Sequence, residues 1–254
     1  MDDSPATSKA EQVARHLLNT IIARQLKPGD TCGTEAELLE RYNVSRPTLR
    51  ESLRVLEAQG VLQLRPGPKG GILVAQPSTD ILAHSLSVHL RLHDVPFVSV
   101  LKAREVIEPA LAAEAAVNGT EEDFADLEAS IERMKAVTDT QAFIEENRLF
   151  HSLVARASGS EVMEIFWQII SILAVGEHHG IPILADHYRE VIEAHEAILD
   201  ACRRRQPKEA AEKMEAHMSA FEAVVRKYYE SQLESPTNVV PKRSRLRRSG
   251  RHSA

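Results

Sequence analysis

Four side chains in the second half of the sequence have the types and spacing of a metal site. Asn147 and His151 are four residues apart, so on a predicted helix over residues 141–158 both side chains point the same way. One helix therefore offers an amide oxygen and an imidazole nitrogen to a single point.

Two more histidines lie on either side of a predicted turn at Gln206-Pro207. His195 precedes this turn and His217 follows it, each by about eleven residues, or ~16 Å at 1.5 Å per residue. In an antiparallel helical hairpin the two imidazoles are level. With Asn147 and His151 they offer nitrogen and oxygen ligands suited to Zn(II), or to Ni(II) or a similar ion. The alternative is that these are ordinary surface or core histidines.

A second group of polar side chains begins a predicted helix with the sequence SRPTLRE, residues 45–51. Arg46 and Arg50 share one face, Ser45 and Thr48 add hydroxyls, and the leucines between them face a core. Such donors reach phosphates and base edges when a helix enters the major groove by its N-terminal turn. The alternative is the solvated basic face of an ordinary amphipathic helix.

The elements around this segment predict a helix, a helix-turn-helix and a wing. Apolar spacing, a Thr-x-x-Glu capping box, a Ser cap followed by Pro, and a glycine-rich loop define the boundaries. We predict helices over residues 13–22, 35–42 and 45–59, and strands over residues 61–64 and 72–75.

Composition predicts a two-domain globular protein without a membrane span. The 254 residues are 43% hydrophobic and 27% charged, and the longest apolar stretch falls well short of the roughly 20 residues that cross a bilayer. Two cysteines cannot form a disulfide framework, and the first ten residues are acidic rather than signal-like. We therefore expect a reduced, cytoplasmic location.

Charge is distributed unevenly along the chain. Residues 1–75 carry ten Lys/Arg against nine Asp/Glu, residues 76–234 carry fifteen against twenty-eight, and residues 235–254 carry six against none. The acidic net charge of −6 therefore comes from the middle of the chain. The acidic net charge therefore does not exclude nucleic acid as a partner of residues 1–75 or 235–254.

These patterns predict a mainly α protein in four parts. A winged helix-turn-helix domain with a small β-hairpin wing (residues 1–75) leads through a hinge (76–80) to an all-α antiparallel helical bundle (81–231) and a disordered basic tail (232–254). About seven helices are expected in the bundle, over residues 81–92, 97–118, 120–137, 141–158, 161–179, 185–204 and 207–230.

Residues 29–74 resemble the winged helix-turn-helix of the GntR family over their whole length. Many relatives carry Arg in the second helix where Ala36 stands here, so that contact is absent. A two-fold homodimer reading a palindromic operator is expected. The resemblance implies that the DNA-contacting residues are Ser45, Arg46, Thr48, Arg50 and, in a wing reaching the minor groove, Gly67.

The basic tail has two interpretations. Its cations could add nonspecific attraction to DNA. We favour the alternative, a solvated and dispensable terminus.

Residues 80–230 resemble the FCD ligand-binding domain of the FadR subfamily. In metal-containing relatives the ligands are one Asp and three His, which match Asn147, His151, His195 and His217 here. The motifs that carry the resemblance are LKAREVIEPALAAEAA (101–116), NRLFHSLVARASGS (147–160), EAHEAILDA (193–201) and EAAEKMEAHM (209–218).

Asn in place of Asp removes one negative charge from the ligand set. The ion would bind less tightly, and the more electropositive site could take an anion, so we expect a small carboxylate effector. Arg104 could clamp that carboxylate through its planar guanidinium, or could instead pair with Glu108 one turn away.

The predicted function is that of a transcriptional regulator, a repressor rather than an activator, and not an enzyme. Operator affinity would change when the effector binds the helical domain. One alternative is a regulator that senses the metal ion itself. Another is a metal-dependent hydrolase, but no carboxylate is placed beside the histidines as a general base and the DNA-reading part would have no role.

Overall fold

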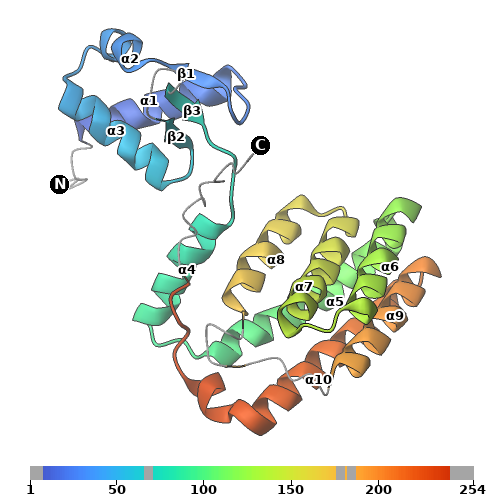
Figure 1. Cartoon of the computed structure of the whole chain (residues 1–254). Coiled ribbons are helices and arrows are strands. Elements are labelled where there is room, and N and C mark those ends of the chain that lie inside the picture. Colours follow the sequence, from blue (N-terminus) through green and yellow to red (C-terminus); the bar gives the residue numbers. More distant parts are fainter. Residues whose placement is uncertain (1–7, 66–70, 176–180, 182–186, 241–254) are drawn as a thin grey trace, which may run out of the picture. The chain divides into compact units, whose positions relative to one another are not determined.

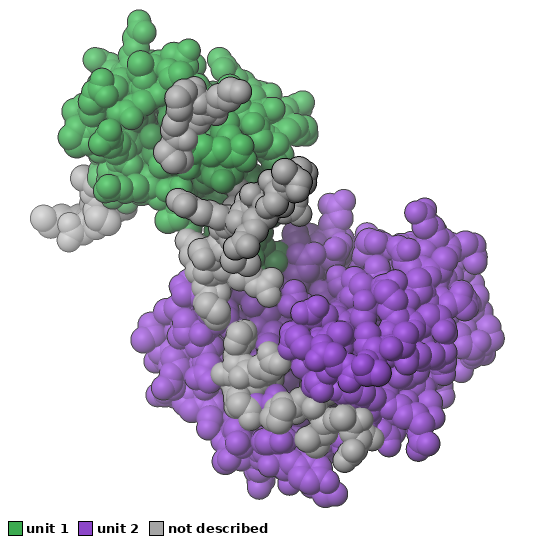
Figure 2. All heavy atoms as spheres, in the orientation of Figure 1, with its two compact units in different colours: residues 1–81 green, residues 82–254 purple. Residues whose placement is uncertain are grey.

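The computed structural model describes residues 8–65, 71–175, 181 and 187–240 (Figure 1). The chain divides into two compact units at residue 81 (Figure 2). The division falls directly after the predicted hinge.

The first unit contains a helix-turn-helix and a small antiparallel sheet. Ser8, Thr34 and Ser45 each cap a helix by accepting a hydrogen bond from a backbone N–H. The turn between the second and third helices passes through Asn43, whose positive φ of 47° ends the second helix. The elements are α1 (Lys9–Ala23), β1 (Thr31–Gly33), α2 (Glu35–Tyr42), α3 (Arg46–Ala58), β2 (Leu62–Arg65) and β3 (Gly71–Val74).

The sheet has the strand order β1-β3-β2. The predicted β2–β3 hairpin is confirmed, whereas β1 was not expected from the sequence. A three-residue strand has too short a pattern to be recognised, and β1 exists because β3 offers it a free edge. Behind the sheet the three helices bury a leucine core that includes Leu17, Leu38, Leu49 and Leu56.

The second unit is the predicted all-helical bundle, and its described part contains the seven helices expected. The helices are α4 (Asp80–Leu92), α5 (Phe97–Asn118), α6 (Glu121–Ala136), α7 (Thr140–Ala157), α8 (Glu161–Leu173), α9 (Tyr188–Arg203) and α10 (Pro207–Glu234). Helix α8 ends six residues before its predicted end. No described helix has the length and apolar character that crossing a membrane requires.

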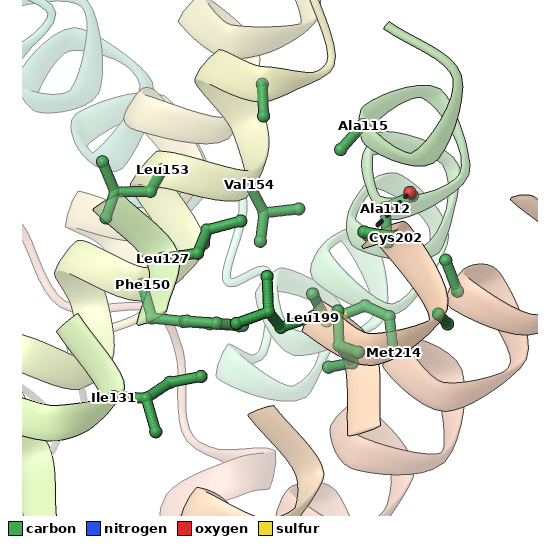
Figure 3. Packing of buried hydrophobic residues seen from close by; sticks show 14 of the residues in the cluster. Ala112, Ala115, Leu127, Ile131, Phe150, Leu153, Val154, Leu199, Cys202 and Met214 are labelled. Carbon is green, nitrogen blue, oxygen red and sulfur yellow. Dashed lines mark hydrogen bonds between the residues drawn. The ribbon is translucent and has the colours of Figure 1, made fainter. Parts of the chain in front are cut away.

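The bundle is held together by an aliphatic and aromatic core between α5, α6, α7, α9 and α10 (Figure 3). Ala112 and Ala115 on α5 are completely buried. Their small side chains let the neighbouring helices approach α5 closely, so that Cys202 on α9 donates to the Ala112 carbonyl oxygen at 3.7 Å. This packing positions the side chains of the site described below.

The predicted disorder from residue 232 onward is wrong for residues 232–240. Helix α10 continues to Glu234, and Leu233, Thr237 and Val240 are completely buried. The backbone N–H of Thr237 donates to the Val95 carbonyl at 2.8 Å. A few apolar side chains and backbone hydrogen bonds are enough to order a segment whose composition resembles a tail. Residues 241–254 lie outside the described residues.

Candidate metal and DNA-binding sites

Three histidines from three helices meet in the interior of the second unit. His151 on α7, His195 on α9 and His217 on α10 are all buried. The Nε2 atom of His217 lies 3.2 Å from Nε2 of His195 and 3.4 Å from Nε2 of His151. Nitrogen atoms of all three fall within 4.8 Å of one another, so one ion could contact all three rings.

The hairpin between α9 and α10 brings His195 and His217 level. Arg205, with a φ of 56°, and Gln206 form the turn, and the two helices pack against each other. The ring of Phe150 stacks on His195 with centroids 3.8 Å apart. Helix packing and this aromatic contact therefore fix the orientation of the His195 imidazole.

Glu108 on α5 is part of the site, and the sequence analysis considered it only as a partner of Arg104. Its side chain is 2% exposed. One carboxylate oxygen accepts from Arg104 Nε at 2.5 Å, and the other contacts Nδ1 of His151. A carboxylate on Nδ1 fixes the ring so that Nε2 faces the other histidines, as in many metal sites. The four-residue spacing from Arg104 was the available signal.

Electrostatics keep the carboxylate charged and the inner histidines neutral. Burial alone would raise the pKa of Glu108, but the charges of Arg104 and His151 hold this pKa well below its usual range. Burial, followed by the charge of His151, lowers the pKa of His217 to about 3, and burial also lowers the pKa of His195. Neutral imidazole is the form that binds metal ions.

The histidine cluster opens into a cavity of about 370 Å³. Its walls include Asn147, His151, His217 and Arg104, so four of the five predicted residues line one space, and the fifth, His195, contacts His217 without lining the cavity. Asn147 is half-buried, one turn before His151. The volume is that of a small-metabolite pocket. The remaining walls are largely apolar and include Trp167, Val191, Ala197, Phe221 and Val225.

Both interpretations of Arg104 have support in the structure. Its Nε–H is engaged by Glu108, which is the intrahelical pair considered from the sequence. The same guanidinium also lines the cavity and has other N–H donors. Two further cations, Arg148 and Lys213, lie on the cavity wall and are exposed.

The predicted DNA-reading residues lie at the N-terminal turn of α3. Ser45 caps this helix and its hydroxyl lies 2.8 Å from that of Thr48. Arg46 and Arg50 are 70% and 63% exposed, on the same face. Both guanidinium groups contact the carboxylate of Glu35 on α2, at 3.4 and 3.6 Å, an acidic neighbour that was not recognised from the sequence.

The wing contact at Gly67 lies outside the described residues. Ala36, at the position where many relatives carry Arg, follows Glu35 on α2 and is exposed. The described face therefore presents two arginines and one carboxylate.

Comparison with known protein families agrees with this division of the chain. Residues 9–74 match the family described as bacterial regulatory proteins, gntR family. Residues 99–220 match the FCD domain. The first match covers α1 to β3, and the second covers Glu108, the three histidines and α10 as far as residue 220.

Individual relatives are regulators of transcription. The chain is 31% identical over 212 residues to the uncharacterized HTH-type transcriptional regulator YcbG of Bacillus subtilis, covering 82% of this chain and 86% of the relative. It is 27% identical over 220 residues to the HTH-type transcriptional repressor NanR of Escherichia coli, covering 84% and 83%.

A solved structure has the same architecture. Streptococcus agalactiae GntR is similar with a TM-score of 0.68 and 26% sequence identity, over 85% of this chain and 99% of that one.

We expect Glu108→Gln to destabilise the second unit strongly. The substitution leaves the buried His151 and the partly buried Arg104 without their charged partner, and breaking a buried pair costs about 3–5 kcal/mol. Urea denaturation followed by circular dichroism measures the loss. The control Glu128→Gln removes an exposed pair with Arg203 and should cost about 1 kcal/mol or less. Equal losses would show that the Glu108 contacts stabilise the protein no more than an exposed ion pair does.

We expect Glu35→Gln to tighten binding to a duplex selected from a random DNA library by the wild-type protein. Removing this carboxylate frees Arg46 and Arg50 and removes repulsion of phosphates, for a gain of roughly three- to tenfold. Fluorescence anisotropy measures the affinity. Glu40→Gln, on the same helix and exposed, changes net charge equally and is the control. A Glu35→Gln protein that binds no tighter than Glu40→Gln would contradict this role.

Proposed function

Because this chain belongs to the GntR family of bacterial transcriptional regulators and carries an FCD domain, we propose that it is a repressor controlled by a small carboxylate effector. The effector would bind in the cavity through a divalent metal held by the histidines. Relatives named as transcriptional repressors support the proposal that this protein represses transcription when it is bound to DNA. As a DNA-binding regulator and not an enzyme, the protein would act in the cytoplasm.

The observation that carries the proposal is the meeting of three Nε2 atoms beside a cavity that His151 and His217 line. Buried imidazoles that only fill a core do not need to point their nitrogens at one another. A divalent ion would turn these lone pairs into ligand bonds, with the Asn147 oxygen as a fourth ligand. The mixed nitrogen and oxygen set suits Zn(II) first and Ni(II) as the alternative.

An anionic effector follows from the charge of this ligand set. Imidazoles bind a metal ion in their neutral form and the Asn147 amide is neutral as well, so the four ligands would leave the ion with its full double charge. The carboxylate of Glu108 lies behind His151, where it is already paired with Arg104. A carboxylate entering the cavity would compensate the ion directly. Arg104, Arg148 and Lys213 would add hydrogen bonds to the same anion.

Control of DNA binding requires the effector to prefer one conformation of the chain. The histidines belong to α7, α9 and α10, so an anion that draws these helices together changes the packing of the bundle. By linkage, a conformation that binds the effector more tightly and the operator more weakly gives effector-induced release.

We also propose a homodimer that reads a palindromic operator. Val162, Ile165 and Phe166 form an apolar face on α8, with exposures of 62%, 43% and 50%. Val106 on α5, the helix against which α8 packs, is 75% exposed. A second copy would cover these side chains, and the two-fold axis would present two α3 helices to symmetric half-sites.

A second candidate function is a sensor of the metal ion itself. The same histidine cluster favours it, because binding of an ion alone would pull three helices toward one point. The two functions differ in their response: a metal sensor changes DNA affinity when Zn(II) or Ni(II) is added without any organic ligand.

We expect about one divalent ion per chain in protein purified without chelator. The variant His195→Ala/His217→Ala loses two of three ligands and should retain none, as measured by elemental mass spectrometry. Absence of metal in the wild type, even after equilibration with Zn(II) or Ni(II), would contradict the metal site.

Asn147→Asp should bind the ion more tightly, by about tenfold or more, because a carboxylate adds charge to the ligand set. Competition with a chelating dye measures the affinity. Glu145→Asp, exposed on the same helix, is the control and should not change it. Equal affinity of Asn147→Asp and wild type would remove residue 147 from the site.

Phe166→Asp should convert the dimer to a monomer. A charge in the centre of an apolar interface removes a large anchor side chain, which weakens association by roughly 30-fold or more. Sedimentation velocity measures the mass. Ile22→Asp, at a 64% exposed apolar residue on α1, is the control and should stay dimeric. A dimeric Phe166→Asp protein would place the interface elsewhere.

A further inference from the structure

Beyond the histidines, the cavity is lined by an unusual share of the aromatic side chains of this protein. Five of the eleven aromatic residues of the chain line it, among them the one tryptophan. They come from four helices and are Phe143, Trp167, Tyr188, Phe221 and Tyr229. A cavity of this size is costly in a core that only packs, because protein interiors are filled to the density of organic crystals. The aromatic walls therefore point to a ligand.

Aromatic side chains on α7 and α9 lie on one side of the histidine cluster. Phe143 precedes His151 by eight residues on α7, or ~12 Å, and Tyr188 precedes His195 by seven residues on α9, or ~10 Å. The rings of Phe143 and Tyr188 stack with centroids 3.7 Å apart. The two helices therefore leave the histidines in the same direction.

Helix α10 adds a third aromatic side chain on the same side. It forms an antiparallel hairpin with α9, so the residues that follow His217 lie level with those that precede His195. Phe221 is one turn after His217, or ~6 Å along the helix, and lines the cavity. We call Phe143, Tyr188 and Phe221 the aromatic end of the cavity.

The lysine and arginine side chains of the described walls lie near the histidines instead. Arg104 pairs with the carboxylate that contacts His151, and Arg148 is three residues from His151. Lys213 is one turn before His217, on the side away from the aromatic end. A carboxylate therefore finds its cations at the histidine end of the cavity.

The aromatic end is unfavourable for a second anionic group. Glu190 lines the cavity two residues after Tyr188. Nδ1 of His187, on the same wall, already lies 3.5 Å from the Glu190 carboxylate. A dicarboxylate would bring its second charge toward this acid, so the walls favour a monocarboxylate.

Hydrogen-bonding groups for a polyhydroxylated ligand are few in the described walls. The Ser171 hydroxyl already donates to the Gln168 carbonyl oxygen at 2.9 Å. The indole N–H of Trp167 and the hydroxyl of Tyr188 are buried and have no hydrogen-bond partner among the described residues, so each could bond one polar substituent. A sugar acid has a hydroxyl on nearly every carbon and would lose more hydrogen bonds to water than these walls replace.

We infer that the effector is an aromatic monocarboxylic acid. Its carboxylate binds at the histidine end, and its ring packs against Phe221 and the stacked pair of Phe143 and Tyr188. Contacts between aromatic rings add affinity beyond the apolar area that they bury. The inference rests on the proposed carboxylate effector and names its chemical class.

The one tryptophan of the chain makes the test direct, because Trp167 lines the cavity. Its fluorescence is followed while the Zn(II)-equilibrated protein is titrated with benzoate, 3-phenylpropanoate, gluconate or succinate. Isothermal titration calorimetry measures each affinity independently. We expect the tighter of the two aromatic acids to bind at least about tenfold more tightly than gluconate or succinate.

Phe221→Leu should weaken binding of the aromatic acid by roughly three- to tenfold, because a ring contact is lost while an apolar side chain remains. Affinity for Zn(II), measured with the chelating dye, should not change, since residue 221 is not among the proposed ligands. Tyr228→Leu removes an exposed aromatic ring from the same helix, outside the cavity walls, and is the matched control. It should bind the acid as wild type does.

Gluconate or succinate binding as tightly as the aromatic acids, or more tightly, would overturn this inference and leave a carboxylate effector in place. Equal affinity of Phe221→Leu and wild type for the aromatic acid would also overturn it. Absence of binding by all four acids would contradict the proposed carboxylate effector and this inference with it. An aromatic acid that binds without changing affinity for a library-selected operator duplex would contradict only the proposed control of DNA binding.

Discussion

Glu108 is a charged carboxylate at the centre of a helical bundle, and its burial must be compensated from two sides. Arg104, one turn earlier on α5, neutralises it, and His151 on α7 contacts its second oxygen. Because this contact occupies Nδ1, the His151 ring presents Nε2 to the partners from α9 and α10. The histidine cluster, the cavity beside it and the packing of α5 against α7 all depend on this one arrangement.

Most of the elements that hold the site follow from local sequence patterns. Caps at Thr34 and Ser45, the apolar spacing in seven long helices and the turn before Pro207 are short-range signals, so the helices and the level positions of His195 and His217 could be predicted. The strand β1 and the ordered segment 235–240 after α10 could not. Their order depends on a partner far away in sequence, β3 and α4 respectively, and not on their own composition.

The contacts in the candidate sites that could not be predicted from the sequence have the same physical origin. Glu108 could be paired with Arg104 from spacing alone, but its contact with His151 joins residues 43 positions apart in the numbering of the chain. Glu35 meets Arg46 and Arg50 only because the turn between α2 and α3 folds back. Both are carboxylates that contact an arginine or histidine side chain of another helix. Such contacts form only when the helices are packed together.

We propose that the three imidazoles hold one ion beside this cavity. X-ray absorption spectroscopy of the Zn(II)-loaded protein tests it most directly, because it reports the ligand atoms themselves. The account predicts three imidazole nitrogens at about 2.0–2.1 Å, completed by oxygen, without sulfur at about 2.3 Å. A zinc–sulfur distance, or a shell without the multiple-scattering signature of imidazole, would contradict it.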